Sequence, residues 1–145
     1  MIVAVLDTNV LASGFIGEDK PTSVPGELIR RWRGKAFALV VSPPILDELT
    51  DTFADPYFTR RLSSSEIADA LQALRVDAVI QPLTVAVGGV ASHPEDDLIL
   101  ATALSAGAPY LVTGDRRLRE RGVYRGVQLL TPRQFLALLE REAPS

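Results

Sequence analysis

The first residues of the chain form a continuous apolar run, Ile2 to Leu6, that ends at Asp7. A strand without alternation between apolar and polar residues is typical of a parallel sheet, whose strands are buried on both faces. Similar runs recur at Phe37–Val41, Tyr110–Thr113 and Val127–Leu130, with a weaker one at residues 79–87. We therefore expect a mainly parallel sheet whose strands are joined by crossovers.

Helical patterns occupy the sequence between these runs. They span residues 25–33, 42–53, 63–75, 96–106 and 131–142. Ser42 and Thr131 are plausible N-caps, and Gly107 is a good helix stop. Ser63 stands three residues before Glu66, which is the spacing of a capping box. Strands that alternate with helices predict a three-layer α/β/α sandwich with a central, mainly parallel sheet.

Length and composition narrow the classes of protein and of site. With 145 residues, of which 47% are hydrophobic, the chain suits one domain over residues 1–145 that needs no disulfides. There is no cysteine and a single histidine, His93, so any metal must bind to oxygen. No apolar run approaches the roughly 18 residues of a membrane span, and no signal peptide is recognisable. We therefore expect a cytoplasmic protein.

Carboxylates follow or flank the strands at one predicted edge of the sheet. In open α/β folds, ligands bind outside the carboxyl ends of the strands. Asp7 ends the first apolar run, and Asp115 follows the "YLVT" run. Glu48 and Asp96 lie on helices that begin or run near the same edge. This topology predicts that the four carboxylates converge.

Four carboxylates in one place need a positive partner. At separations of ~5 to 6 Å and an effective dielectric of about 20, each pair repels by roughly 3 kcal/mol. Mg²⁺ or Mn²⁺ would neutralise them, since both prefer oxygen ligands and are commonly held by a few carboxylates together with a substrate phosphate. Such metals activate water and stabilise charge on a phosphodiester, which predicts phosphodiester hydrolysis.

Each acid also has a purely structural interpretation. Asp7 could cap the helix that follows its strand, and Asp115 could be a turn residue after Gly114. Glu48 could be an ordinary surface glutamate of an amphipathic helix. In "HPEDD", at least one acid is expected to respond to the positive helix N-terminus. The metal hypothesis therefore depends on the predicted topology.

Arginine supplies thirteen of the fifteen basic residues, in a chain of net charge -3. The arginines cluster at "RRWR" (30–33), "RR" (60–61) and "RRLRERG" (116–122). We expect Arg116, Arg117 and Arg119 to bind phosphates, because they directly follow Asp115. Trp32 could stack on a base. The alternatives are solvated helix faces and a core position for Trp32.

Four motifs together resemble those of PIN-domain proteins and are similar to the VapC-type ribonuclease toxins of toxin-antitoxin pairs. They are "VLDTNVL", "SPPILDEL", "HPEDDLILATALSAGAPYLVTGD" and "LLTPRQFL", of which the first and third together are strongly specific. The resemblance implies that acidic residues bind Mg²⁺ or Mn²⁺ at the carboxyl edge of a parallel sheet. The acids at these places are Asp7, Glu48, Asp96 and Asp115.

The resemblance also implies supporting residues. In "DDLILATA" the first aspartate aligns with the family acid, so Asp96 is preferred to Asp97, which takes a supporting role. Asn9 and Thr113 match small polar residues of the family that could hydrogen-bond a carboxylate. The family often has aspartate where this chain has His93, and we assign that histidine no catalytic role.

The activity implied is that of a metal-dependent endoribonuclease acting on single-stranded or structured RNA, as the toxin of a toxin-antitoxin pair. Family toxins are commonly inhibited by an antitoxin and often form homodimers, so RNA, a cognate antitoxin and a second copy are the expected partners.

A non-catalytic PIN-fold module that binds RNA or protein is the alternative. A phosphotransfer site with Asp7 as nucleophile is disfavoured, because Asn9 stands where the haloacid-dehalogenase pattern has a second aspartate.

Overall fold

The computed structural model describes residues 1–89 and 94–142. Its six-stranded sheet has the order β3-β2-β1-β4-β6-β5. The strands are β1 (Val3–Leu6), β2 (Ala38–Val41), β3 (Val79–Ile80), β4 (Tyr110–Val112), β5 (Val123–Tyr124) and β6 (Val127–Leu130). Neighbouring strands pair in parallel, except that β5 is antiparallel to β6. The mainly parallel sheet predicted from the sequence is confirmed.

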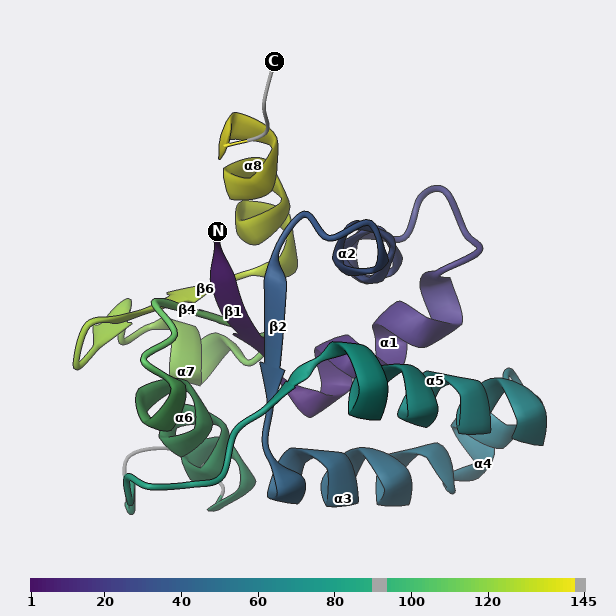
Figure 1. Cartoon of the computed structure of the whole chain (residues 1–145), viewed down its shortest axis with the longest axis horizontal. Helices are drawn as coiled ribbons and strands as arrows, with labels where there is room; N and C mark the ends of the chain where they lie inside the picture. The colour runs from purple at the N-terminus through teal and green to yellow at the C-terminus, as the bar shows by residue number, and fades with distance from the viewer. Residues whose placement is uncertain (90–93, 143–145) are drawn as a thin grey trace.

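Helices cover both faces of the sheet. They are α1 (Thr8–Gly17), α2 (Val24–Arg33), α3 (Pro43–Phe53), α4 (Pro56–Thr59), α5 (Ser64–Asp77), α6 (Pro94–Ala106), α7 (Arg116–Arg119) and α8 (Pro132–Glu142). One face carries α6 and α7, and the other carries α1, α2 and α8 (Figure 1), which confirms the three-layer α/β/α fold. None of these helices, within the residues described, is long and apolar enough to cross a membrane.

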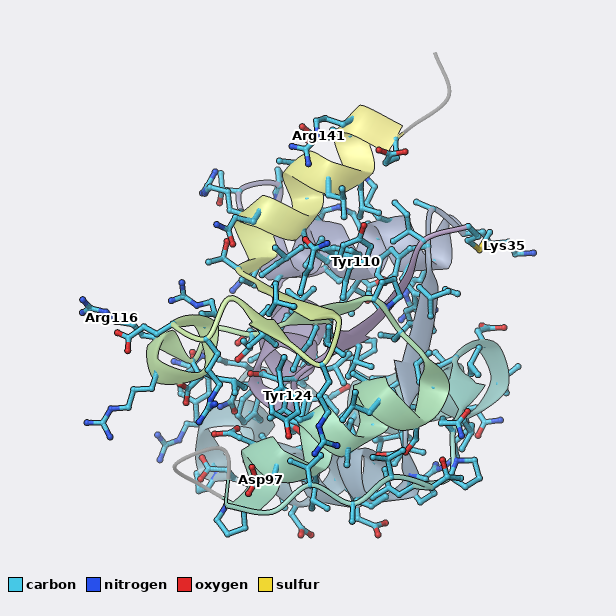
Figure 2. All side chains as sticks on the ribbon, turned by 90° about the vertical axis from the view of Figure 1, so that its left-hand side faces the viewer. Lys35, Asp97, Tyr110, Arg116, Tyr124 and Arg141 are labelled. Carbon is cyan, nitrogen blue, oxygen red and sulfur yellow. The ribbon has the colours of Figure 1, made fainter. Side chains whose placement is uncertain are left out.

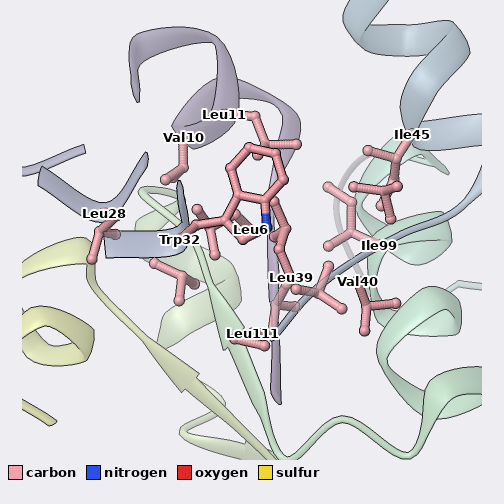
Figure 3. Close-up of a cluster of buried hydrophobic side chains, with 14 of the residues drawn as sticks. Leu6, Val10, Leu11, Leu28, Trp32, Leu39, Val40, Ile45, Ile99 and Leu111 are labelled. Carbon is pink, nitrogen blue, oxygen red and sulfur yellow. The ribbon is translucent and has the colours of Figure 1, made fainter. Parts of the chain in front are cut away.

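The core joins three central strands to α2. Leu6, Leu39 and Leu111 come from β1, β2 and β4, and each is at most 1% exposed. Trp32 of α2 lies among these side chains (Figure 3) and is 5% exposed. Burial of its large ring stabilises the fold and removes it from the surface. The prediction that Trp32 stacks on a base is therefore wrong, and the alternative of a core position is confirmed.

Glycines allow α1 and α2 to pack closely together. A Cβ on Gly26 would lie 2.0 Å from the carbonyl oxygen of Gly17, and one on Gly14 would lie 2.9 Å from that of Pro25. Atoms cannot approach so closely, so these positions exclude any side chain unless the helices move apart. The contact fixes α1, which begins directly after Asp7 at the carboxyl end of β1.

Ser42, Ser63 and Thr131 each stand directly before a helix as predicted, but only Ser63 and Thr131 cap through a side-chain hydrogen bond. Ser63 and Glu66 form the expected capping box, and the Thr131 hydroxyl accepts a hydrogen bond from the backbone three residues later. The Ser42 side chain caps nothing. It is buried and forms a 2.8 Å hydrogen bond with the Thr102 hydroxyl of α6, which ties the start of α3 to that helix.

The weak strand predicted at residues 79–87 is limited to β3. Beyond it, the backbone N–H groups of Thr84 and Val85 donate to the hydroxyl of Ser105 at 2.9 and 3.1 Å, so the chain is held by a side chain of α6 rather than by a strand. The short elements α4, α7 and β5 were not predicted. Their two to four residues are too few for a period to be recognised.

Candidate functional site

Asp7 lies at the carboxyl end of β1 and is only 5% exposed. Its Oδ1 accepts a hydrogen bond from the backbone N–H of Val10 at 2.9 Å, which makes Asp7 the N-cap of α1. Its Oδ2 accepts a hydrogen bond from the Thr113 hydroxyl at 2.5 Å. Both carboxylate oxygens are therefore held in place by neighbouring elements.

Asp115 follows β4 and begins α7. Its Oδ1 accepts a 2.9 Å hydrogen bond from the backbone N–H of Leu118, and its own N–H donates to the Thr113 hydroxyl at 3.0 Å. Thr113 is completely buried. One hydroxyl therefore links Asp7 to Asp115 and fixes the distance between the ends of β1 and β4.

The surroundings of Asp7 disfavour its negative charge. Burial raises the pKa of Asp7 above its usual value, and the nearby charge of Asp115 raises it further. Hydrogen bonds from Thr113 and from the backbone of Val10 and Asn9 lower the pKa but do not offset the burial. A cation beside Asp7 would relieve both unfavourable effects.

Three of the four predicted acids line one pocket of about 360 Å³: Asp7, Asp96 and Asp115. The other described residues that line it are Asn9, Val10, Ser13, Pro25, Gly114 and Pro132. Asp96 is half-buried in the first turn of α6. The pocket lies where the carboxyl ends of β1 and β4 meet the starts of α1, α6 and α7, the position expected for a ligand in a parallel α/β fold.

Glu48 and Asp97 do not line this pocket. Glu48 is half-buried in the middle of α3. Asp97 of α6 is 8% exposed and accepts a hydrogen bond from the backbone N–H of Gly89 at 3.1 Å. Figure 2 labels this residue. His93 lies outside the described residues.

The donors from the described residues of the pocket suit a hard divalent cation, because they are carboxylate, amide and hydroxyl oxygens. Among the described residues, no group of three or more aspartate, glutamate or histidine side chains stands close enough to hold an ion as it is arranged. Mg²⁺ commonly needs only one or two carboxylates, with waters and substrate oxygens completing its shell. Asp7 and Asp115 meet that requirement, with Asp96 in the same pocket.

Two polar residues near the site, Ser13 and Thr8, were not predicted from the sequence. Ser13 lines the pocket and lies four residues after Asn9 on α1. That spacing places both on one helix face, a signal the sequence does contain. Thr8 is 2% exposed, and its hydroxyl has no hydrogen-bond partner in the part of the chain that the structure describes.

The arginine clusters differ in their surroundings. In "RRWR", Arg30 and Arg31 both pair with Glu27, at 2.6 and 3.0 Å, and Arg33 pairs with Glu18. These arginines are engaged in structural ion pairs. After Asp115, Arg116 and Arg117 are exposed and Arg119 is half-buried. Figure 2 shows Arg116 extending away from the body of the molecule.

The chain matches the model of a known family. Residues 3–117 match the family model described as "PIN domain". The matched region contains β1 through β4 and the starting residues of α7, and so includes all the predicted acidic site residues. A comparison with curated proteins gave no significant match.

Solved structures with a similar fold include two at low sequence identity. One is the crystal structure of VapBC2 from Rickettsia felis bound to a DNA fragment from their promoter, with a TM-score of 0.59 and 15% identity over 90% of this chain and 98% of that chain. The other is a domain of a functionally unknown protein from Methanocaldococcus jannaschii, with a TM-score of 0.55 and 16% identity over 90% and 91% of the two chains. At these identities the likeness establishes the fold.

Proposed function

Because the chain belongs to the PIN domain family, we propose that it is an endoribonuclease that depends on Mg²⁺ or Mn²⁺ and cleaves single-stranded or structured RNA. The observation that carries this proposal is the pocket shared by Asp7, Asp96 and Asp115. These three residues and Glu48 are the proposed metal ligands. Three acids from separate elements in one small pocket are hard to explain by helix capping alone.

The proposed ligands would have different tasks. Asp7 and Asp115 are held by backbone and hydroxyl donors, so they would define where the ion sits. Asp96 would approach from α6, and Asp97 would support the start of that helix through Gly89. A bound divalent ion would neutralise charge on the scissile phosphate and lower the pKa of the attacking water.

Other pocket residues would handle the substrate. Asn9 is exposed in the pocket and Ser13 lies on the same helix face, so both could hydrogen-bond a phosphate or sugar oxygen. Arg116, Arg117 and Arg119 would bind backbone phosphates beside Asp115. The protein chain would thus orient the phosphodiester, and the acids would hold the ion against it.

We also propose a protein partner. The similar Rickettsia felis structure is that of VapBC2 bound to promoter DNA, and an acidic pocket of this kind would attract an arginine or lysine from an antitoxin segment. In this proposal the chain is the cytoplasmic toxin of such a pair. A homodimer or higher homo-oligomer is part of the same proposal.

Cleavage of a mixed-sequence single-stranded RNA in Mn²⁺, Mg²⁺ or EDTA tests the enzyme. We expect cleavage with metal only, and its loss in Asp7→Asn and Asp96→Asn variants shown by circular dichroism to be folded. The matched control is Asp47→Asn. Asp47 is an exposed aspartate of α3 outside the pocket, so this variant should cut RNA at the wild-type rate.

Other results would change the assignment. Activity that survives in Asp96→Asn but is lost in Asp97→Asn would move the ligand to Asp97. Cleavage in EDTA, or full activity in Asp7→Asn, would contradict the proposed site. RNA binding without cleavage in any of the metals would favour the non-catalytic module.

A further inference from the structure

The segment from Arg116 to Arg125 contains more arginines than any other ten-residue stretch of the chain. Its ten residues, "RRLRERGVYR", contain five arginines and one glutamate, a net charge of +4 in a chain of net charge -3. We call this segment the arginine ribbon. It comprises α7, the connection to β5, and β5 with the residue that follows it.

Arg116 and Arg117, at the start of the arginine ribbon, are exposed. Arg116 pairs with Glu120 at 3.9 Å, between side chains that are 87% and 66% exposed. Such exposed pairs contribute little and break easily. The buried Nε of Arg119 has no hydrogen-bond partner among the described residues. The arginines of "RRWR", by contrast, are paired with Glu27 and Glu18.

The arginine ribbon starts at the pocket and leads away from it. Asp115, which lines the pocket, caps α7. The chain then enters β5, the outermost strand of the sheet, which runs antiparallel to β6 with Val123 opposite Gln128. Because β6 runs toward the carboxyl edge of the sheet, β5 runs from that edge toward the opposite one. The arginines therefore continue from the pocket down one side of the molecule.

Helix α3 presents the opposite charge. Between Pro43 and Phe53 it contains three acidic residues and no basic residue. Figure 1 shows α3 and α7 on different sides of α6 and apart from each other. A polyanion that reached the pocket would be attracted along the arginine ribbon and repelled along α3.

We infer that the arginine ribbon is the track along which one flank of a single-stranded RNA substrate leaves the pocket. This inference rests on the proposed function. Arg116 and Arg117 would contact the phosphates nearest to the pocket, and the exposed Arg125 a phosphate further along the strand. Substrate would thus be bound mainly on one side of the scissile bond.

Binding measured without turnover tests this track. The anisotropy of a labelled single-stranded RNA of 12 nucleotides is followed in EDTA at several salt concentrations. The double variant Arg116→Gln/Arg117→Gln should bind about 10-fold more weakly than the wild type. The slope of log K against log[salt] should fall in magnitude by about 1.4, because each lost phosphate contact on a single strand is worth about 0.7.

Arg60→Gln/Arg61→Gln is the charge-matched control. It removes two charges from exposed residues at the end of α4, which lies far from α6 and α7 in Figure 1 and contributes no residue to the described pocket lining. We expect its affinity to stay within about 2-fold of the wild type. A DNA strand of the same sequence carries the same phosphate charges, so its binding should weaken by a similar factor in Arg116→Gln/Arg117→Gln.

Different results would contradict the arginine track and the proposed ribonuclease activity. If both double variants bind like the wild type, or weaken equally, the arginine ribbon is not the track, whatever the cleavage assay shows. If only Arg116→Gln/Arg117→Gln binds weakly while no metal supports cleavage, the track stands and the ribonuclease proposal fails. Weak binding that is restored in Arg116→Lys/Arg117→Lys would confirm that charge, rather than a local change in fold, carries the effect.

Discussion

The acids at the ends of strands and the acids on helices are held in different ways. Asp7 and Asp115 each cap the helix that follows, and both are joined to the Thr113 hydroxyl. Their positions follow from the pairing of β1 with β4, in which Leu6 lies opposite Val112. The strand ends therefore form a site geometry that exists before any ligand binds.

Asp96 and Glu48 depend instead on where α6 and α3 lie. Asp96 lines the pocket from the first turn of α6, and Glu48 lies in the middle of α3 and outside the pocket lining. A rotation or shift of either helix would therefore move its carboxylate relative to the ends of β1 and β4. The difference teaches that one half of the proposed site is positioned by the sheet and the other half by helix packing.

Replacing an acid from each half should give unequal losses. We expect Asp115→Asn to lower kcat/KM for RNA cleavage by about 10³-fold, the scale of losing a preorganised electrostatic group. Glu48→Gln should cost only about 10-fold, because Glu48 lies outside the pocket lining and would support the ion less directly than Asp115. Single-turnover cleavage in saturating Mn²⁺ measures both. Equal losses would show that α3 moves toward the pocket when substrate binds.

This comparison also explains what could be predicted from sequence. Asp7 and Asp115 follow apolar runs whose carboxyl ends must share an edge of a parallel sheet, so their meeting could be inferred from topology. The Thr113 hydroxyl bridge could not, because it depends on the register of β1 against β4. The rotation of α3, which decides whether Glu48 faces the pocket, leaves no local signal either. Register and helix rotation are set by packing across the whole core.

Removing the hydroxyl that links the strand ends should have an intermediate effect. Thr113→Val keeps the shape of this buried side chain but deprives Asp7 and the N–H of Asp115 of a partner. We expect metal affinity to fall by 10- to 100-fold, the usual cost of losing a residue that orients a metal ligand. Isothermal titration with Mn²⁺ measures it. Thr113→Ser, which keeps the hydroxyl, is the control, and a loss of the same size in that variant would assign the effect to packing.

The smallest effect concerns the stability of the fold without metal. Burial raises the pKa of Asp7, so its protonated form favours the folded state, and that stabilisation is lost as the pH rises through the folded pKa. Asp7→Asn has no carboxyl group to ionise, so the variant does not lose this stabilisation at neutral pH. Asparagine is also a good N-cap for α1. The variant should therefore melt a few degrees above the wild type at neutral pH in EDTA, although it should not cut RNA.

The pH dependence of this difference identifies its cause. The gain in melting temperature of Asp7→Asn over the wild type should shrink as the pH falls below the ordinary aspartate pKa, because Asp7 is then protonated in both the folded and the unfolded chain. Thermal melts from pH 3.5 to 7.5 measure it, with Asp47→Asn as the exposed control. A variant that is less stable than the wild type at neutral pH would mean that the hydrogen bonds from Val10 and Thr113 outweigh the cost of burial. The charge on Asp7 would then stabilise the fold as well as the proposed metal site.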